Sequence, residues 1–223
     1  MARMPGTSFA PEEQQRLESA RYALLRRLAF AMRHELVVHL QPIAMIMEVV
    51  GRRLQADPPD FPKVRDGMEK VNGHARAAVH SSLDVVGWVA PEEEPPVALA
   101  AAVNECVELL RTHLSFRGFA LQAQTSVACE VPRAAVRQAV SAALLALTDH
   151  GASPADVHID CTESGGAARV TLEVRRTEAA PGFPASPPYR LLTWSDVEAI
   201  AQAEGVGCQR QGEAVTLTFA LRA

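Results

Sequence analysis

The sequence predicts an α+β fold, in which an N-terminal helical hairpin forms a dimeric four-helix bundle and a C-terminal α/β sandwich follows. Two changes in pattern carry this prediction. Before residue 90, apolar residues recur at alternating steps of three and four, whereas after residue 97 alternating strand patterns appear between shorter helices. The proline-rich stretch 90–96 (Ala-Pro-Glu-Glu-Glu-Pro-Pro) separates the two patterns and is typical of an interdomain linker.

The N-terminal part predicts two long helices that pair as a hairpin over residues 11–90. A heptad-like seam runs along about 11–55, the segment 55–60 contains two prolines that break the helix, and a second seam follows. Two helices alone bury little apolar surface, so two copies are expected to pack together, which predicts a homodimer. The arginine pairs at 26–27 and 52–53 are expected on solvated faces. The seam residues are Tyr22, Leu25, Ala29, Met32, Leu36, His39, Ile43, Ile46 and Val50, then Val64, Met68, Val71, Ala75, Ala78, Ser82, Val85 and Val89.

The sequence pattern after the linker predicts a second domain at 97–222. This domain is expected to be an α/β sandwich, in which a mixed sheet carries helices on one face. Turns are expected at Gly165-Gly166 and at Gly212, between pairs of strands. The expected order is a helix at 97–114, a strand at 119–127, a helix from Pro132 to about 147, strands at 157–161 and 169–174, a helix at 194–203 capped by Thr193 or Ser195, and strands at 208–211 and 214–221.

Composition and charge exclude several classes of function. The 223 residues carry a formal net charge of −4, so the basic surface of a general nucleic-acid binder is not expected. Apolar runs are far shorter than the roughly 20 residues that span a bilayer, and the N-terminus has no apolar signal-peptide core. The four cysteines lack the spacing of zinc ligands. We therefore expect a cytoplasmic protein without nucleic-acid or membrane partners and without a metal site of its own.

The segment 34–43 (His-Glu-Leu-Val-Val-His-Leu-Gln-Pro-Ile) holds the candidate reactive residues. His34 and His39 are five residues apart, about 140° around a helix, which does not match the four-residue spacing of a helical zinc site. On the heptad, His39 falls inside the seam, as a polar residue that helps to set register, and His34 falls farthest from the seam. An exposed imidazole on a rigid helix can act as a nucleophile, and Glu35 beside it can accept a proton. On position alone, an ordinary solvated residue is the more common explanation for a histidine such as His34.

This helix resembles the dimerisation and phosphoacceptor domain of two-component histidine kinases. The resemblance rests on the His-Glu-Leu motif at 34–36 in a helical hairpin, followed by an apolar residue six positions and an isoleucine nine positions after the histidine. It implies that the histidine at His34 is phosphorylated and that the acid at Glu35 assists proton transfer.

The order of elements in the second domain is similar to the ATP-binding domain of the same kinases, but the nucleotide motifs differ. The asparagines that hold magnesium and phosphate in the family fall at Ala142 and Ala146, and alanine supplies no oxygen ligand. The segment after Val174 lacks the aspartate and glycines that read adenine, and the proline-rich loop 180–188 stands where a glycine-rich lid is expected. The resemblance and its departures together imply a degenerate kinase ATPase-like domain without ATP binding.

The resemblance implies a histidine phosphotransfer protein in a two-component phosphorelay, closest in type to kinase-derived histidine phosphotransferases. His34 is expected to relay a phosphoryl group to or from the aspartates of response-regulator receiver domains, and the receiver is expected to supply the magnesium. Two alternatives stay open. One is a non-catalytic dimeric adaptor that binds signalling proteins, which the apolar pair Val37-Val38 favours; the other is an atypical histidine kinase, against which Ala142 and Ala146 argue.

Overall fold

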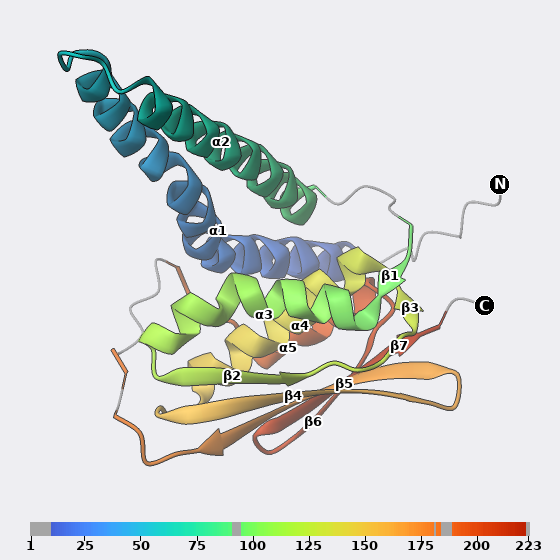
Figure 1. The fold of residues 1–223 in the computed structure, drawn as a ribbon. Helices are drawn as coiled ribbons and strands as arrows, with labels where there is room; N and C mark the ends of the chain where they lie inside the picture. Colours follow the sequence, from blue (N-terminus) through green and yellow to red (C-terminus); the bar gives the residue numbers. More distant parts are fainter. Residues whose placement is uncertain (1–9, 91–94, 181, 184–188, 222–223) are drawn as a thin grey trace. The chain divides into compact units, whose positions relative to one another are not determined.

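The computed structural model describes residues 10–90, 95–180, 182–183 and 189–221, and it has the α+β fold predicted from the sequence (Figure 1). The predicted proline-rich linker and loop lie partly outside these residues. The described elements, in chain order, are α1 (Pro11–Leu54), α2 (Phe61–Val89), β1 (Val97–Ala98), α3 (Leu99–Phe116), β2 (Phe119–Gln124), β3 (Glu130–Val131), α4 (Arg133–His150), β4 (Ala155–Ser164), β5 (Ala167–Arg176), α5 (Trp194–Ala203), β6 (Gly207–Gln211) and β7 (Ala214–Ala220).

The chain divides into two compact units, and the division falls inside α1. One unit begins at Phe30 and contains the rest of α1 with all of α2. The other contains α1 up to Ala29 together with every element from β1 to β7. The sequence predicted a domain boundary at the proline-rich linker. The structure adds a second boundary between the units, which falls within the continuous helix α1. None of the helices in the described part combines the length and the apolar character needed to span a bilayer.

In the hairpin unit, specific contacts stabilise the turn between α1 and α2. Asp60 caps α2, because its side chain accepts a hydrogen bond from the backbone N–H of Lys63. Gly67 faces α1 so closely that a Cβ at this position would lie 2.5 Å from Cγ2 of Val50. The glycine therefore lets the two helices approach near the turn, and α1 itself continues as a helix through Pro42.

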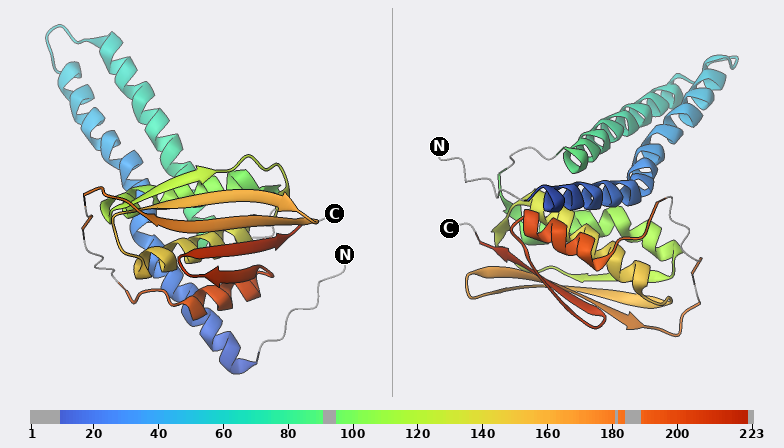
Figure 2. Two further views of the ribbon diagram at one scale, coloured as in Figure 1. Left: turned by 90° about the horizontal axis from the view of Figure 1, so that it is seen from below. Right: turned by 180° about the vertical axis from the view of Figure 1, so that it is seen from behind.

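The sheet of the α/β unit has five strands in the order β2-β4-β5-β7-β6. β2 pairs with β4 in parallel, and the other neighbours pair in antiparallel register. Side chains alternate along the central strands, so that Ile159, Leu172 and Leu217 point into the core and are fully buried. Helices α3, α4 and α5 cover this face, which is the one-sided packing that the sequence predicts (Figure 2).

Helix α4 is the central core helix of this layer, and its small side chains allow the neighbouring elements to pack closely. It begins after Pro132 and is buried on most sides, with no exposed surface at Ala142 or Ala146. The next helix, α5, begins with a capping box between Thr193 and Asp196, so Thr193 rather than Ser195 is the cap.

An ion cluster joins α3 to α4. The carboxylate of Glu105 lies 2.6 Å from Nη2 of Arg133 and 2.9 Å from Nε of Arg137. Burial by itself would raise the pKa of Glu105, but the hydrogen bonds and charges of the two arginines outweigh it and hold this pKa below its ordinary value of 4.5.

The depressed pKa of Glu105 predicts a loss of stability in acid. A carboxyl group with a lowered pKa in the folded state contributes stability above its unfolded pKa, and this contribution disappears as the pH falls through the folded pKa. Urea unfolding below about pH 4.5 should therefore show a steeper fall in the free energy of unfolding for the natural chain than for Glu105→Gln. Parallel profiles for the two proteins would contradict this assignment.

The first part of α1 differs from the predicted seam. Tyr22 was expected inside the seam but is 52% exposed, whereas Arg27 was expected in solvent but is only 2% exposed. The buried face is shifted around the helix because residues 11–29 pack against the α/β unit rather than continuing the hairpin. The apolar side chains buried on this face are Leu17, Ala20, Ala23, Leu24 and Leu28.

Candidate functional site

His34 lies on α1 in the hairpin unit, and its side chain is exposed, as its heptad position predicts. Within the described part of the chain, no hydrogen bond or ion pair involves its imidazole. His34 lies within the continuous helix α1, in the part that belongs to the hairpin unit. The site is thus a single exposed imidazole on a helix of the hairpin.

Exposed apolar side chains extend along α1 on the same face as His34. Val38 and Met45 follow His34 by four and eleven residues, spacings that keep side chains on one side of a helix. Val38 is 47% exposed and Met45 is 62% exposed, and Gln41 between them is exposed as well. Within the two to three turns after His34, a protein partner would therefore meet two apolar side chains and one amide, and the charged side chains of Glu48 and Arg52 follow farther along the same face.

The structure does not bring Glu35 or His39 into contact with His34. Glu35 is half-buried and follows His34 directly, and adjacent helical residues point about 100° apart. His39 is half-buried, as expected of a seam residue. Among the described residues, no three His, Cys, Asp or Glu side chains converge in a way that could hold a metal ion. Any proton transfer to Glu35 would therefore require a change of rotamer or a bridging water.

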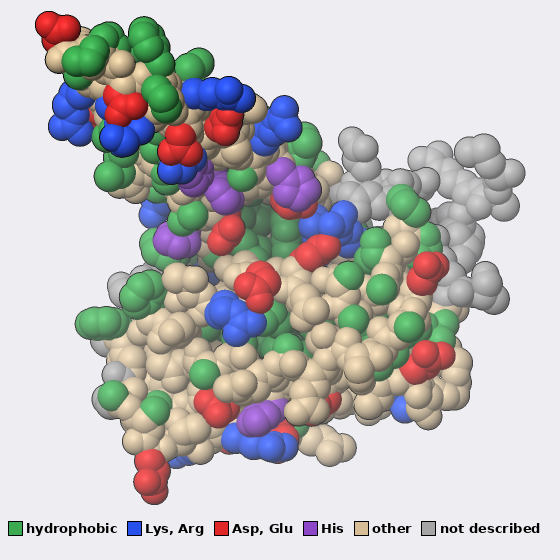
Figure 3. Space-filling view, viewed as in Figure 1, with side chains coloured by type: hydrophobic (Ala, Val, Ile, Leu, Met, Phe, Trp, Pro, Cys, Tyr) green, Lys and Arg blue, Asp and Glu red, His purple; other side chains and the backbone are tan. Residues whose placement is uncertain are grey.

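A second apolar stripe runs along the hairpin; the sequence analysis missed it except for Met68, which was predicted inside the seam and is 59% exposed. On each helix its exposed members recur at spacings close to whole turns and share one face. The centre of the α1 stripe lies about a third of a turn away from His34 around the helix. Hydrophobic side chains are visible on the hairpin in Figure 3, interspersed with charged ones. The members are Val37, Leu40, Met47 and Leu54 on α1, and Phe61, Met68, Val79 and Val86 on α2.

The residues that the resemblance places at the nucleotide motifs of the kinases lie in α4, around the end of β5 and before α5. Ala142 and Ala146 face the core, so no ligand can reach them without displacing core side chains. After Val174, the guanidinium of Arg175 pairs with Glu173 on the same strand, and the backbone N–H of Thr177 donates to the carbonyl of Pro154. Before α5, Leu192 is fully buried.

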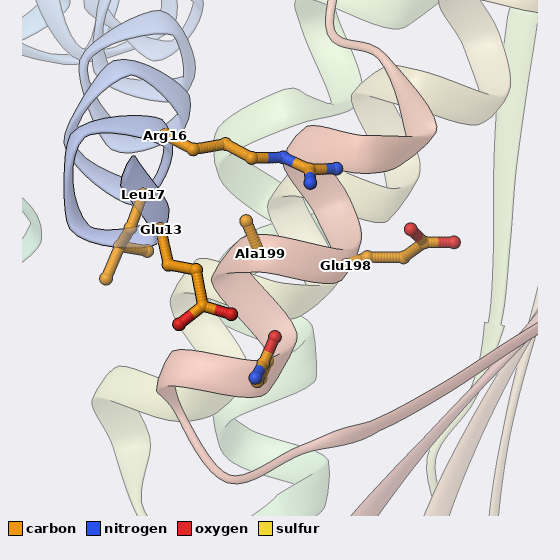
Figure 4. A pocket seen from close by; sticks show the side chains of 6 residues that line it. Glu13, Arg16, Leu17, Glu198 and Ala199 are labelled. Atoms are coloured by element: carbon orange, nitrogen blue, oxygen red, sulfur yellow. The ribbon is translucent and has the colours of Figure 1, made fainter. Parts of the chain in front are cut away.

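A small pocket lies between the beginning of α1 and α5, with a volume of about 110 Å³ (Figure 4). Glu13 and Arg16 line it from α1, and Glu198 and Gln202 line it from α5. Sites for small molecules typically have volumes of about 300–1,000 Å³ and apolar walls. This pocket is smaller and lined mainly by charged and polar side chains, so we regard it as a gap between two packed helices.

Comparison with known proteins identifies similar architectures but no family. No protein-family model matches the chain. No curated protein matches it either. Among solved structures, the chain is similar to a histidine kinase from Burkholderia phymatum (16% identity, 95% of this chain and 97% of that chain, TM-score 0.42). It is also similar to a bacterial phosphotransferase (14% identity, 96% and 98%, TM-score 0.39) and to the histidine kinase AdeS of Acinetobacter baumannii (14% identity, 80% and 96%, TM-score 0.43).

Proposed function

We propose, from the premise that this chain is similar to two-component histidine kinases in its architecture, that it is a histidine phosphotransfer protein of a phosphorelay. One observation carries the proposal. The imidazole of His34 is exposed on a helical hairpin, whereas Ala142 and Ala146, at the positions of the ligating asparagines of kinases, are closed inside the core. These two features support a phosphoacceptor at His34 and, at positions 142 and 146, offer no oxygen ligand for a magnesium nucleotide.

The proposed reaction moves a phosphoryl group between two side chains. A ring nitrogen of His34 attacks the phosphorus of a receiver aspartyl phosphate, so that a P–N bond forms while the P–O bond to the aspartate breaks. The aspartate leaves as a carboxylate, and the proton on the other ring nitrogen passes to Glu35 or to water. Transfer to a second receiver is the reverse of this step. Magnesium bound by the receiver would stabilise the charge on the phosphoryl oxygens.

The receiver would dock along α1 on the face that carries His34. Val38 and Met45 offer exposed apolar surface there, and Gln41 offers an amide between them. Interface centres are typically apolar with few charges, so this strip has the composition of a docking surface beside the reactive residue. Docking would place the receiver aspartate opposite the imidazole, and positioning of this kind supplies much of the rate of phosphoryl transfer.

We further propose that the hairpin pairs with a second copy through its second apolar stripe. Exposed apolar surface on both helices of one hairpin is what a four-helix bundle requires, because each helix of such a bundle contacts two neighbours. His34 lies beside this stripe rather than on it, so dimerisation would leave the imidazole of each protomer accessible.

Val79→Glu is the variant that tests this dimer. Val79 is 62% exposed within one chain, so the substitution should leave the protomer folded. We expect the Kd of the dimer, measured by analytical ultracentrifugation, to rise at least about 100-fold because two carboxylates would lose their hydration in the interface. His80→Glu is the matched control, since the side chain of His80 is 83% exposed on the same helix and lies off the stripe. A natural chain that stays monomeric at high concentration would contradict the proposal.

The experiment that tests the function compares two phosphoryl donors. The purified chain is incubated with radiolabelled ATP and magnesium, and separately with receiver domains that carry labelled aspartyl phosphate. Label from receivers alone supports phosphotransfer, and label from ATP would instead identify an atypical kinase.

A non-catalytic adaptor is the second candidate function. The exposed side chains of Val37 and Val38, directly after Glu35, favour it because they supply binding surface and no polar group for chemistry. Absence of label with both donors, together with stable binding of receivers, would support the adaptor and refute phosphotransfer.

A further inference from the structure

A cluster of buried charges joins the first part of α1 to the α/β unit. Both terminal nitrogens of Arg27 donate to the carboxylate of Asp149 at the end of α4, and the distance from Nη2 to Oδ1 is 2.6 Å. The side chain of Asp149 has no exposed surface. The same carboxylate lies 3.1 Å from Nη1 of Arg117, just after α3, and accepts the backbone N–H of Leu192 at 3.2 Å. We call Arg27, Arg117, Asp149 and Leu192 the Asp149 node.

The arginines of the Asp149 node depend on the negative charge of Asp149. Two guanidinium groups share one carboxylate, and Nε of Arg117 is buried without a hydrogen-bond partner among the described residues. Burial, followed by the positive charges of Arg117 and Arg27, lowers the pKa of the neighbouring His113, and the charge of Asp149 opposes this shift. Asp149 is therefore the counter-charge for the whole cluster, and each arginine depends on it.

Further contacts extend from the Asp149 node along the first part of α1. Ala20 and Ala23 are fully buried, and their small side chains allow the helix to approach closely. Polar and aromatic contacts to α5 and to the segment before it flank this apolar face. They are Arg16 to the carbonyl of Ser195 (3.4 Å), Arg21 to Glu204 (2.6 Å), Arg190 to Ser19 (3.5 Å) and the edge-to-face pair Tyr22–Tyr189, with ring centroids 5.5 Å apart.

We propose that residues 11–29 are an integral part of the α/β domain, and that the Asp149 node is the latch that holds them there. The domain is then attached to the helix that carries His34 in two ways, through the chain that follows α2 and through packing on α1 itself. The inference goes beyond the proposed phosphotransfer and does not depend on it, since the latch would serve an adaptor equally well.

The test removes the covalent connection between the hairpin and the α/β domain, so that only the noncovalent packing of residues 11–29 can hold them together. A protease recognition sequence is inserted after Ala90 in the full chain, and the folded protein is then cleaved there. We expect the two pieces to co-elute in gel filtration at micromolar concentration. Arg27→Ala should raise their dissociation constant at least tenfold, because Asp149 loses a buried partner.

Arg21→Ala is the matched control because it removes an arginine of the same helix whose side chain is 45% exposed, and it should change the dissociation constant less than about threefold. Both substitutions lie on the α1 piece, so the α/β piece is identical in every arm. Separation of the natural pieces, or equal weakening by the two variants, would overturn the proposal.

Hydrogen exchange on the intact natural chain provides a second measurement that needs no variant to fold. Amides of residues 16–28 should exchange as slowly as those of α4, because the two segments belong to one cooperative unit. Exchange of residues 16–28 at the rate of a fraying helix end would also overturn the proposal.

Discussion

Replacing His34 by alanine should abolish phosphoryl uptake from labelled receiver domains, with a loss of roughly three orders of magnitude or more, the scale on which removal of a nucleophile acts. The substitution removes the ring nitrogens and leaves the helix intact, because alanine has the highest helix propensity and His34 packs against no core. The measurement is the initial rate of label transfer at fixed receiver concentration. The label on the natural chain should also be lost in acid and retained in alkali, as expected for a P–N bond.

His80→Ala is the control for this experiment. His80 is an exposed histidine of the same hairpin, so its removal changes the number of imidazoles without touching the proposed site. We expect its rate of label transfer to equal that of the natural chain. Equal labelling of His34→Ala and the natural chain would place the phosphoryl group elsewhere and refute the proposed function.

The elements of this fold were largely predictable because local patterns determine them. Prolines in the turn between α1 and α2 mark the hairpin, and the helix at 194–203 was predicted with the bounds of α5. The strands at 157–161 and 169–174 were predicted too short, since the residues that extend them are alanines and polar or charged residues, which do not continue the alternation of large apolar side chains. The short pairing of β1 with β3 was missed, because two-residue strands leave no periodic signal.

The division of α1 was not predictable from heptad spacing. Spacing shows that apolar residues share a face, but it does not show which neighbour that face meets. The pattern continued smoothly through Ala29, so one seam was assigned to the whole helix, although the two parts pack against different partners. Two signals were present in the sequence: Ala20 and Ala23 are small residues on one face with Leu24, and Arg27 directly follows Arg26 without a nearby acid on the helix.

The candidate site was predictable only in part, for a similar reason. The exposure of His34 follows from its distance to the seam, which is a property of one helix. The exposed surface beside it could not be found while Val37 and Leu40 were treated as positions outside a single seam, although they belong to a second stripe. The pairing of Asp149 with Arg27 joins residues 122 positions apart and depends on tertiary packing, which sequence spacing does not encode.

The second large effect is expected at Asp149, where substitution by asparagine should lower the free energy of unfolding by about 3–5 kcal/mol. Asparagine keeps the size of the side chain but removes its charge, so Arg27 and Arg117 would remain buried together without a counter-charge. Its amide group would also direct N–H donors at guanidinium donors. Urea unfolding of the full chain, at one fixed protein concentration because dimerisation shifts stability, measures the difference.

Two further variants test whether the effect of Asp149→Asn comes from the buried arginines left without a counter-charge or from the loss of a hydrogen bond. Glu204→Gln removes the carboxylate from the exposed pair with Arg21 and should cost less than about 1 kcal/mol. Adding Arg27→Met to Asp149→Asn should recover part of the lost stability, because it removes one of the two uncompensated charges. If the double variant is instead less stable than Asp149→Asn alone by the full cost of Arg27→Met, the two residues act independently and the carboxylate is not the shared counter-charge of the node.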